Sequence, residues 1–158
     1  MMTLIKNETV ALTELVSSLH FGEKVERAKK LLEWAFDKFG DKAVVANSLG
    51  KDSLVVWDLA KKVNPDVKGF IVTTKYKPSE TVEFMFDLVR RNPSLQIFKS
   101  DEEVGDLYKT DPDACCQILK VEPVRRAIRE MEVECWITGL RCTEGRTRTD
   151  FKEIEQRD

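Results

Sequence analysis

Residues 42–57 have the sequence KAVVANSLGKDSLVVW, and the rest of the chain is organised around this stretch. Small or β-branched apolar residues at 43–46 predict a short strand that is buried on both faces. The apolar run at 54–63 predicts a helix. A strand that leads directly into a helix is the repeating unit of an α/β fold.

The joint between this strand and this helix is a candidate phosphate site. Ser48, Gly50 and Ser53 place small side chains where backbone N–H groups must come close to a ligand. The helix that follows points the positive end of its dipole at the same place, and Lys51 adds a mobile positive charge. The joint differs from the GxxxxGK[ST] loop, because only one glycine precedes the lysine and the spacing is shorter. The alternative is an ordinary strand-to-helix turn with a Ser/Asp cap.

The composition is that of one soluble globular domain, with 158 residues, 42% hydrophobic and 34% charged residues. A chain of this length buries roughly 68–70% of its unfolded surface around one core. We therefore expect a single nucleotide-binding domain over residues 1–158, in which residues 1–40 are a helical lead-in. The net charge of −2 gives no general attraction to nucleic acid or to an anionic membrane, so binding of a polyanion must be local.

The sequence shows no targeting or membrane segment. No apolar run reaches the ~18–20 residues that a membrane span needs, and Lys6 and Glu8 interrupt the N-terminal segment. The expected location is therefore the cytoplasm. The cysteines are too few for a disulfide scaffold, and the adjacent Cys115 and Cys116 favour metal chemistry instead. No flavin or nicotinamide motif is found.

Patterns along the chain repeat the alternation of helix and strand. Apolar spacing predicts helices at residues 8–19, 23–39, 79–91 and 121–131, and strands at residues 68–74, 95–98 and 135–138. Gly40 closes the second of these helices, and Ser79 is expected to cap the third. Residues 99–119 are polar without a clear period and are predicted to be a long loop. The alternation predicts an α/β fold, an open doubly wound parallel sheet with helices on both faces.

In such a sheet, a ligand binds outside the carboxyl ends of the strands, near the point where the strand order reverses. The second strand ends in Thr74, and the fourth is followed by Gly139 and Arg141. Guanidinium groups bind phosphate or sulfate oxygens bidentately, so Arg141, Arg146 and Arg148 would complete a pocket for two linked anionic groups. The alternative for these arginines is a solvated charged tail.

Several segments carry a resemblance to known proteins. SLGKDS at residues 48–53 resembles the SxGKDS loop of the adenosine-nucleotide α-hydrolases, which include the PP-loop ATP pyrophosphatases. ETVEF at 80–84, CCQILKVEP at 115–123 and WITGLR at 136–141, followed by Thr147-Arg148, are similar to segments of the phosphoadenylyl-sulfate and adenylyl-sulfate reductases. These segments stand in the order of that family, so the chain is identified as a member from about residue 25 to its end.

The resemblance implies an adenosine phosphosulfate site and a reaction. The residues that would surround the substrate are Ser48, Gly50, Lys51, Asp52, Ser53, Thr74, Lys120, Gly139, Arg141 and Arg148. In the family, a cysteine thiolate attacks the sulfate sulfur, and a thioredoxin-like thiol releases sulfite from the resulting S-sulfo-cysteine. Cys115 and Cys116 would be two ligands of a 4Fe-4S cluster, with Lys120 offsetting charge between the cluster and the substrate. An oligomer is compatible with this assignment.

The chain also departs from the family pattern. It has neither the downstream CxxC that completes the cluster ligands nor the ECGxH segment that carries the nucleophile, so the ligand set is incomplete and no catalytic residue is assigned. Cys135 and Cys142 are poor substitutes for the missing ligands. The turn after the second strand, TKYKPSET, differs from the family's TGxxFPET. We therefore expect a truncated or fragmentary reductase that ends near Asp158, before a further strand and the catalytic tail.

Other functions stay open at this point. GKDS is more usual where the β- and γ-phosphates of ATP are held, which favours an ATP pyrophosphatase-like adenylating enzyme, similar to ATP sulfurylase small subunits or nucleotidyltransferases. The missing tail favours an inactive nucleotide-binding module. The sequence is compatible with both 3′-phosphorylated and unphosphorylated substrates.

Overall fold

The computed structural model describes residues 18–141 and 152–156 of the chain. Contacts divide the chain into two compact units, Leu32–Gly139 and a smaller unit of Met1–Leu31 with Leu140–Asp158. The larger unit contains the whole sheet. The helix predicted at residues 8–19 lies outside the described residues. None of the described helices is long and apolar enough to cross a membrane.

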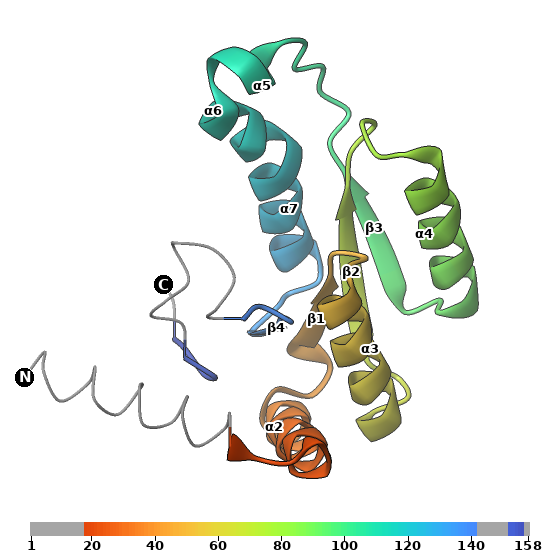
Figure 1. Cartoon of the computed structure of the whole chain (residues 1–158), viewed down its shortest axis with the longest axis vertical. Coiled ribbons are helices and arrows are strands. Elements are labelled where there is room, and N and C mark those ends of the chain that lie inside the picture. The colour runs from red at the N-terminus through yellow and green to blue at the C-terminus, as the bar shows by residue number, and fades with distance from the viewer. Residues whose placement is uncertain (1–17, 142–151, 157–158) are drawn as a thin grey trace, which may run out of the picture. The chain divides into compact units, whose positions relative to one another are not determined.

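The sheet has four parallel strands in the order β3-β2-β1-β4 (Figure 1). The strands are β1 (Ala43–Asn47), β2 (Lys68–Thr73), β3 (Leu95–Lys99) and β4 (Cys135–Ile137). Val45 of β1 lies opposite Gly69 of β2 on one side and opposite Ile137 of β4 on the other. The chain thus runs outward from β1 through β2 to β3 and then returns to the free side of β1. The strand order reverses between β1 and β4, which is where open α/β sheets bind ligands.

Helices cover both faces of the sheet, which confirms the doubly wound prediction. On one face, α2 (Phe21–Phe39), α3 (Lys51–Val63) and α4 (Ser79–Arg91) are found. They pack Leu32, Trp57 and Met85 against Val45 and Ile71. On the other face, α7 (Glu122–Glu130) packs its apolar side on the sheet (Figure 1). This second core consists of Val44, Phe70, Phe98, Ala127 and Met131. Neighbouring residues of β1 therefore point to opposite faces, as in any strand.

Gly69 sets how closely α3 approaches the sheet. A Cβ at this position would lie 2.6 Å from the Trp57 ring and 2.9 Å from Leu95 Cδ1. A glycine in the middle of a strand commonly marks such a close approach. Trp57 can therefore lie this close to β2 only because residue 69 has no side chain.

Local capping signals in the sequence account for some of the helix ends but not for all of them. Gly40 has a left-handed φ of +57° directly after α2, as predicted for a C-terminal glycine. The predicted cap at Ser79 is wrong, because Pro78 is the residue before α4 and no side chain caps this helix. Ser79 instead donates a hydrogen bond to Glu80 at 3.2 Å. Pro78 has its φ fixed at −56° by the ring and an extended ψ of 148°, and Ser79 lies inside the first turn.

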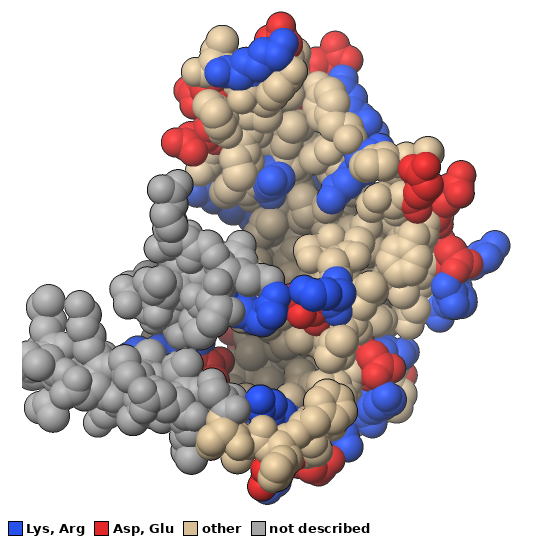
Figure 2. Space-filling view, viewed as in Figure 1, with Lys and Arg blue, Asp and Glu red and all other residues tan. Residues whose placement is uncertain are grey.

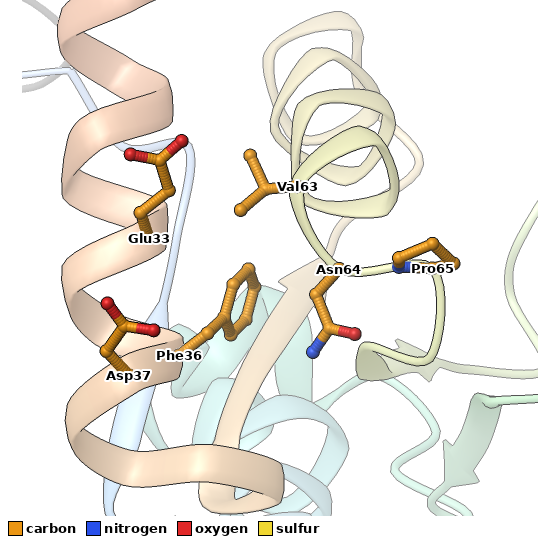
Figure 3. A pocket seen from close by; sticks show the side chains of 6 residues that line it. All are labelled: Glu33, Phe36, Asp37, Val63, Asn64 and Pro65. Carbon is orange, nitrogen blue, oxygen red and sulfur yellow. The ribbon is translucent and has the colours of Figure 1, made fainter.

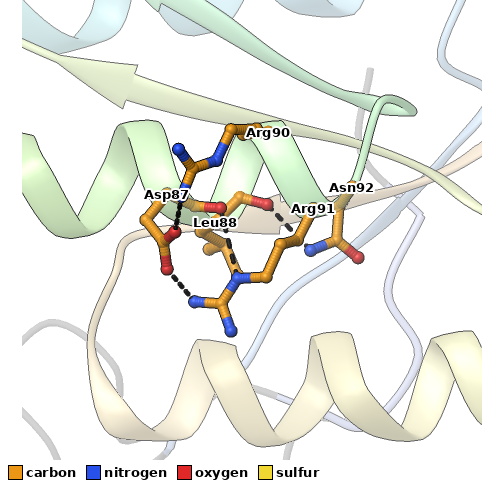
Figure 4. Close-up of polar contacts among 5 residues, drawn as sticks. All are labelled: Asp87, Leu88, Arg90, Arg91 and Asn92. Atoms are coloured by element: carbon orange, nitrogen blue, oxygen red, sulfur yellow. Dashed lines mark hydrogen bonds and ion pairs between the residues drawn. The ribbon is translucent and has the colours of Figure 1, made fainter.

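The last turn of α4 is held by side chains. Asp87 accepts hydrogen bonds from Arg90 and Arg91, and the Asn92 amide donates to the Leu88 carbonyl at 2.8 Å (Figure 4). These bonds satisfy polar groups at a helix end, where the last carbonyls have no partner within the helix.

The predicted loop at 99–119 is wrong beyond residue 106. This segment contains α5 (Leu107–Thr110) and α6 (Pro112–Cys116), and a π-helical turn (Gln117–Val121) joins α6 to α7. Asp111 caps α6 by accepting from the Ala114 N–H at 3.0 Å, with Pro112 at the first position. Because these helices are short and mostly exposed, they have no apolar period to reveal them. Pro123 has no N–H to donate, and the wider π turn ends two residues before it, at Val121.

Candidate functional site

Helix α3 begins at the carboxyl end of β1. It starts at Lys51, earlier than the apolar run at 54–63 predicts, and Gly50 precedes it without a side-chain cap. The N–H groups of a first helical turn have no acceptor within the helix, and the helix dipole places partial positive charge there. A Cβ on Gly50 would meet Ser48 Oγ at 3.3 Å. The joint therefore presents backbone donors at the reversal of the strand order.

The two serines of the loop, Ser48 and Ser53, make hydrogen bonds to each other and to neighbouring residues. Ser53 is 5% exposed, and its Oγ lies 3.1 Å from Ser48 Oγ, 3.1 Å from Asn47 Oδ1 and 2.9 Å from the Gly50 carbonyl oxygen. The Ser48 N–H donates to the same hydroxyl at 3.2 Å. Ser53 thus fastens the two ends of the loop to each other, whereas the side chain of Ser48 is exposed.

Asn47 is absent from the site residues predicted from the sequence. It is the last residue of β1 and is 2% exposed, and its Oδ1 accepts a hydrogen bond from the Leu49 N–H at 2.8 Å. Leu49 has a left-handed φ of +66°. Asparagine commonly bonds the backbone two residues further on in turns. A polar residue that ends a buried strand just before the loop is the signal that could have identified it.

Lys51 and Asp52 begin α3 side by side. The Lys51 side chain is 77% exposed, and its Nζ lies 3.4 Å from Asp52 Oδ2. Exposed ion pairs of this kind are weak, so the ammonium group can turn toward an anion at low cost. An exposed positive charge therefore lies at the loop.

Gly139 contacts the first turn of α3 through its backbone. A Cβ on Gly139 would lie 3.0 Å from the carbonyl group of Asp52 and 3.1 Å from the Ser53 nitrogen. The structure thus brings the segment after β4 against the loop after β1, as the topology predicts. The role of this glycine is to permit close packing, because any side chain would push α3 away.

The turn after β2 is tied to the segment after β3. Thr74 Oγ1 accepts from the Tyr76 N–H at 3.3 Å. Lys75 Nζ lies 2.5 Å from Glu103 Oε1. This hydrogen bond and the lysine's charge hold the pKa of Glu103 below its ordinary value, and the same bond raises the pKa of Lys75. The charge of Lys75 is thus paired at this end of the sheet.

The described cysteines give only part of a metal site. Cys115 and Cys116 lie in α6 and not in a loop as predicted, and consecutive helical residues do not face each other. Burial raises the pKa of the Cys135 thiol, partly opposed by the charge of Lys38, which disfavours the thiolate that a metal needs. Within residues 18–141 and 152–156, no group of three or more His, Cys, Asp or Glu side chains could hold a metal ion. These residues do not fit a cluster with four thiolate ligands, and Cys142 lies outside them.

The other predicted residues lie on the π turn, in the smaller unit or outside the described residues. Lys120 is exposed on the π turn between α6 and α7. Arg141 is exposed and belongs to the smaller unit. Arg146 and Arg148 lie outside the described residues. The arginine part of the pocket therefore stays a prediction.

A hollow of about 370 Å³ lies at the other end of α3 (Figure 3). It is lined by Glu33, Phe36, Asp37, Val63, Asn64 and Pro65. Its carboxylates and the negative end of the α3 dipole make it unsuited to a phosphate. Elsewhere, positive and negative side chains are interspersed on the visible face of the described residues (Figure 2). The start of α3 is therefore better suited to an anion than this hollow at its other end.

Comparisons with known proteins identify a family. The model of the phosphoadenosine phosphosulfate reductase domain matches residues 42–158. The adenosine 5′-phosphosulfate reductase of Halalkalibacterium halodurans is 31% identical over 146 residues, which cover 85% of this chain and 62% of the relative. That of Geobacillus sp. is 33% identical over 141 residues, which cover 83% of this chain and 59% of the relative. The chain thus spans about three-fifths of the length of these curated relatives.

A solved structure shows the same fold. The crystal structure of phosphoadenylyl-sulfate reductase from Candida auris, a phosphate complex, aligns with a TM-score of 0.61 and 22% identity. The alignment covers 78% of this chain and 69% of that chain.

Proposed function

Because the chain belongs to the phosphoadenosine phosphosulfate reductase family, we propose that it is the nucleotide-binding part of a sulfonucleotide reductase. Its substrate is adenylyl sulfate or the 3′-phosphorylated form. The observation that carries this proposal is the uncapped start of α3 at the point where the strand order reverses, next to Gly139. Such a helix start binds phosphate and sulfate groups through its N–H groups and its dipole.

The residues of the site have separate roles in this proposal. Gly50 lets the backbone approach one anionic group, and Lys51 adds charge to it. Thr74, Lys120, Arg141 and Arg148 contribute to the rest of the substrate, as the family resemblance implies. Ser53 holds the two ends of the loop together, and Asp52 pairs with Lys51 in the first turn of α3.

The proposed reaction is a thiol-dependent reduction to sulfite. A cysteine thiolate attacks the sulfate sulfur, the bond from sulfur to the phosphate oxygen breaks, and S-sulfo-cysteine forms. The leaving group is AMP from adenylyl sulfate, or adenosine 3′,5′-bisphosphate from the 3′-phosphorylated form. A thiol of a thioredoxin-like partner then releases sulfite and leaves a disulfide. The binding step is the one that we assign to the described residues, because none of their cysteines carries the family's nucleophile motif. Cys115 and Cys116 are only two of the four thiolates that an iron-sulfur cluster normally needs, so no step of this proposal involves a cluster. A cytoplasmic location and an oligomeric state stay predictions from the sequence.

Titration calorimetry with AMP, adenylyl sulfate and ATP with magnesium tests the proposed site. Replacing Gly50 by valine should weaken binding of adenylyl sulfate by about tenfold or more, since one lost hydrogen bond to a charged group has that effect. Gly22→Val is the control, because a Cβ on Gly22 meets nothing within 4 Å. Equal affinities of the wild type and Gly50→Val would remove the loop from the site. Tighter binding of ATP with magnesium would indicate an adenylating enzyme instead.

The arginines need a ligand comparison. If Arg141 and Arg148 bind the distal anionic group, Arg141→Ala or Arg148→Ala should weaken binding of adenylyl sulfate much more than that of adenosine. Only adenylyl sulfate presents oxygens to the guanidinium groups. An equal loss for both ligands would indicate damage to the fold, and no loss would indicate solvated side chains.

A further inference from the structure

Asn47 connects the end of β1 to both ends of the loop that follows. Its Oδ1 accepts hydrogen bonds from the Leu49 N–H at 2.8 Å and from the Ser53 hydroxyl at 3.1 Å. The left-handed backbone of Leu49, with a φ of +66°, costs free energy in a residue that has a Cβ. The bond from Asn47 offsets this cost and favours this conformation of the loop.

The orientation of the Asn47 amide is fixed by its partners. A backbone N–H can only donate, so the atom that faces Leu49 must be the amide oxygen. Nδ2 is then buried and has no partner within the described part of the chain. An unpaired buried amide destabilises a protein, whereas a serine could offer an acceptor without this cost. Such a conflict with local stability is typical of functional positions.

We propose that Asn47 is a positioning residue of the anion site. It holds the loop in the conformation that directs the N–H groups of the first turn of α3 toward a phosphate or sulfate group. This inference rests on the proposed function of the loop. Asn47 acts through its hydrogen bonds with Leu49 and Ser53, because its own side chain is buried at 2% exposure.

The conformation of the loop should matter for ligands that carry an oxyanion. The groups that the loop orients are N–H donors at the positive end of a helix, and these recognise oxyanions. Loss of the loop conformation should therefore weaken binding of adenylyl sulfate, while adenosine, which has no such group, should be affected little.

Calorimetry on three variants tests this inference. Asn47→Ala removes both hydrogen bonds and should weaken binding of adenylyl sulfate by about tenfold, with less than about a threefold change for adenosine. Asn47→Ser keeps an acceptor for the N–H two residues on and should recover part of the affinity. Asn64→Ala is the matched control, because Asn64 accepts from the Asp66 N–H at 3.0 Å at the other end of α3. This control should leave both affinities unchanged.

Hydrogen exchange of the Leu49 amide gives a second measurement that needs no ligand. Exchange should be faster in Asn47→Ala than in the wild type, intermediate in Asn47→Ser and unchanged in Asn64→Ala. If Asn47→Ala does not fold, Asn47→Ser decides by the same two measurements.

The outcomes separate this inference from the proposed function. A wild-type protein that binds neither adenylyl sulfate nor AMP contradicts the proposed function. The role of Asn47 is overturned if the wild type binds adenylyl sulfate and Asn47→Ala has the same ratio of affinities for adenylyl sulfate and adenosine as the wild type. If Asn47→Ala does not fold, the same result for Asn47→Ser overturns it. A lower urea midpoint with that ratio unchanged also overturns it, because the side chain would then be merely structural.

Discussion

Glu132 and Leu49 are the non-glycine residues with a left-handed backbone in the described part of the chain. Glu132 has a φ of +51° and is exposed in the turn between α7 and β4. This conformation brings the Cβ of glutamate close to the backbone and costs free energy, whereas glycine adopts it readily. Glu132→Gly should therefore stabilise the protein by about 0.5–1 kcal/mol in urea unfolding.

A control for this prediction lies nearby. Glu130 is the last residue of α7, and Glu130→Gly should destabilise the protein by roughly 0.5–1 kcal/mol, since glycine is a poor helix former. If both substitutions destabilise the protein equally, the backbone of Glu132 carries no strain.

The pair of Lys75 and Glu103 gives a pH dependence. The pKa of Glu103 is lowered in the folded state, so the stabilisation from its carboxylate is present above the ordinary glutamate pKa and is lost as the pH falls through the lowered value. The pKa of Lys75 is raised, so its contribution is present below the ordinary lysine pKa and is lost as the pH rises through the raised value. An NMR titration should show the pKa of Glu103 returning to its ordinary value in Lys75→Met. Lys77→Met should leave it lowered, and an unchanged pKa in Lys75→Met would show that the pair does not form in solution.

At the scale of elements, the contact between α3 and the sheet depends on Gly69. Gly69→Ala would place a methyl group 2.6 Å from the Trp57 ring. Overpacking of this kind destabilises a core by about 1–3 kcal/mol, which urea unfolding measures. In the double variant with Trp57→Phe, the smaller ring should relieve part of this loss, so the two effects should not add. If the changes in unfolding free energy of the two single variants add up to that of the double variant, the two residues are not in steric conflict.

The sequence predicts the elements that pack on the sheet better than those that do not. Each strand and the helices α2, α3, α4 and α7 have an apolar pattern, because burial against β1 and β2 requires it. Helices α5 and α6 have no such pattern, and only the cap at Asp111 with Pro112 marks them. The early start of α3 has the same cause, since its first turn is polar and is held by the loop.

At the scale of the whole molecule, the topology accounts for the part of the site that could be predicted. Parallel strands bring the loop after β1 and Gly139 after β4 to the same edge, so motif residues far apart in sequence meet there. The inward bonding of Ser53 and the role of Asn47 depend on hydrogen-bond geometry that spacing along the chain does not encode. The arginines belong to the other unit or lie outside the described residues, so only the ligand comparison tests them.

The last prediction concerns iron and the whole chain. Four-iron clusters are normally bound by four thiolates, but Cys115 and Cys116 are adjacent residues of one short helix, and burial disfavours the thiolate form of Cys135. We therefore expect the 158-residue chain to bind iron weakly and to lose it to a chelator. Anaerobic reconstitution with iron and sulfide, followed by a visible spectrum and iron and sulfide counts, measures this.

Serine variants identify the ligands in that experiment. Cys115→Ser and Cys116→Ser should each lower the iron count, because each removes one of the two adjacent thiols, while Cys135→Ser should leave it unchanged. A stable cluster that survives the chelator would contradict the prediction. Loss of such a cluster in Cys135→Ser or Cys142→Ser would show that these cysteines supply the ligands that the family takes from its CxxC segment, since a four-thiolate site has no other source in this chain.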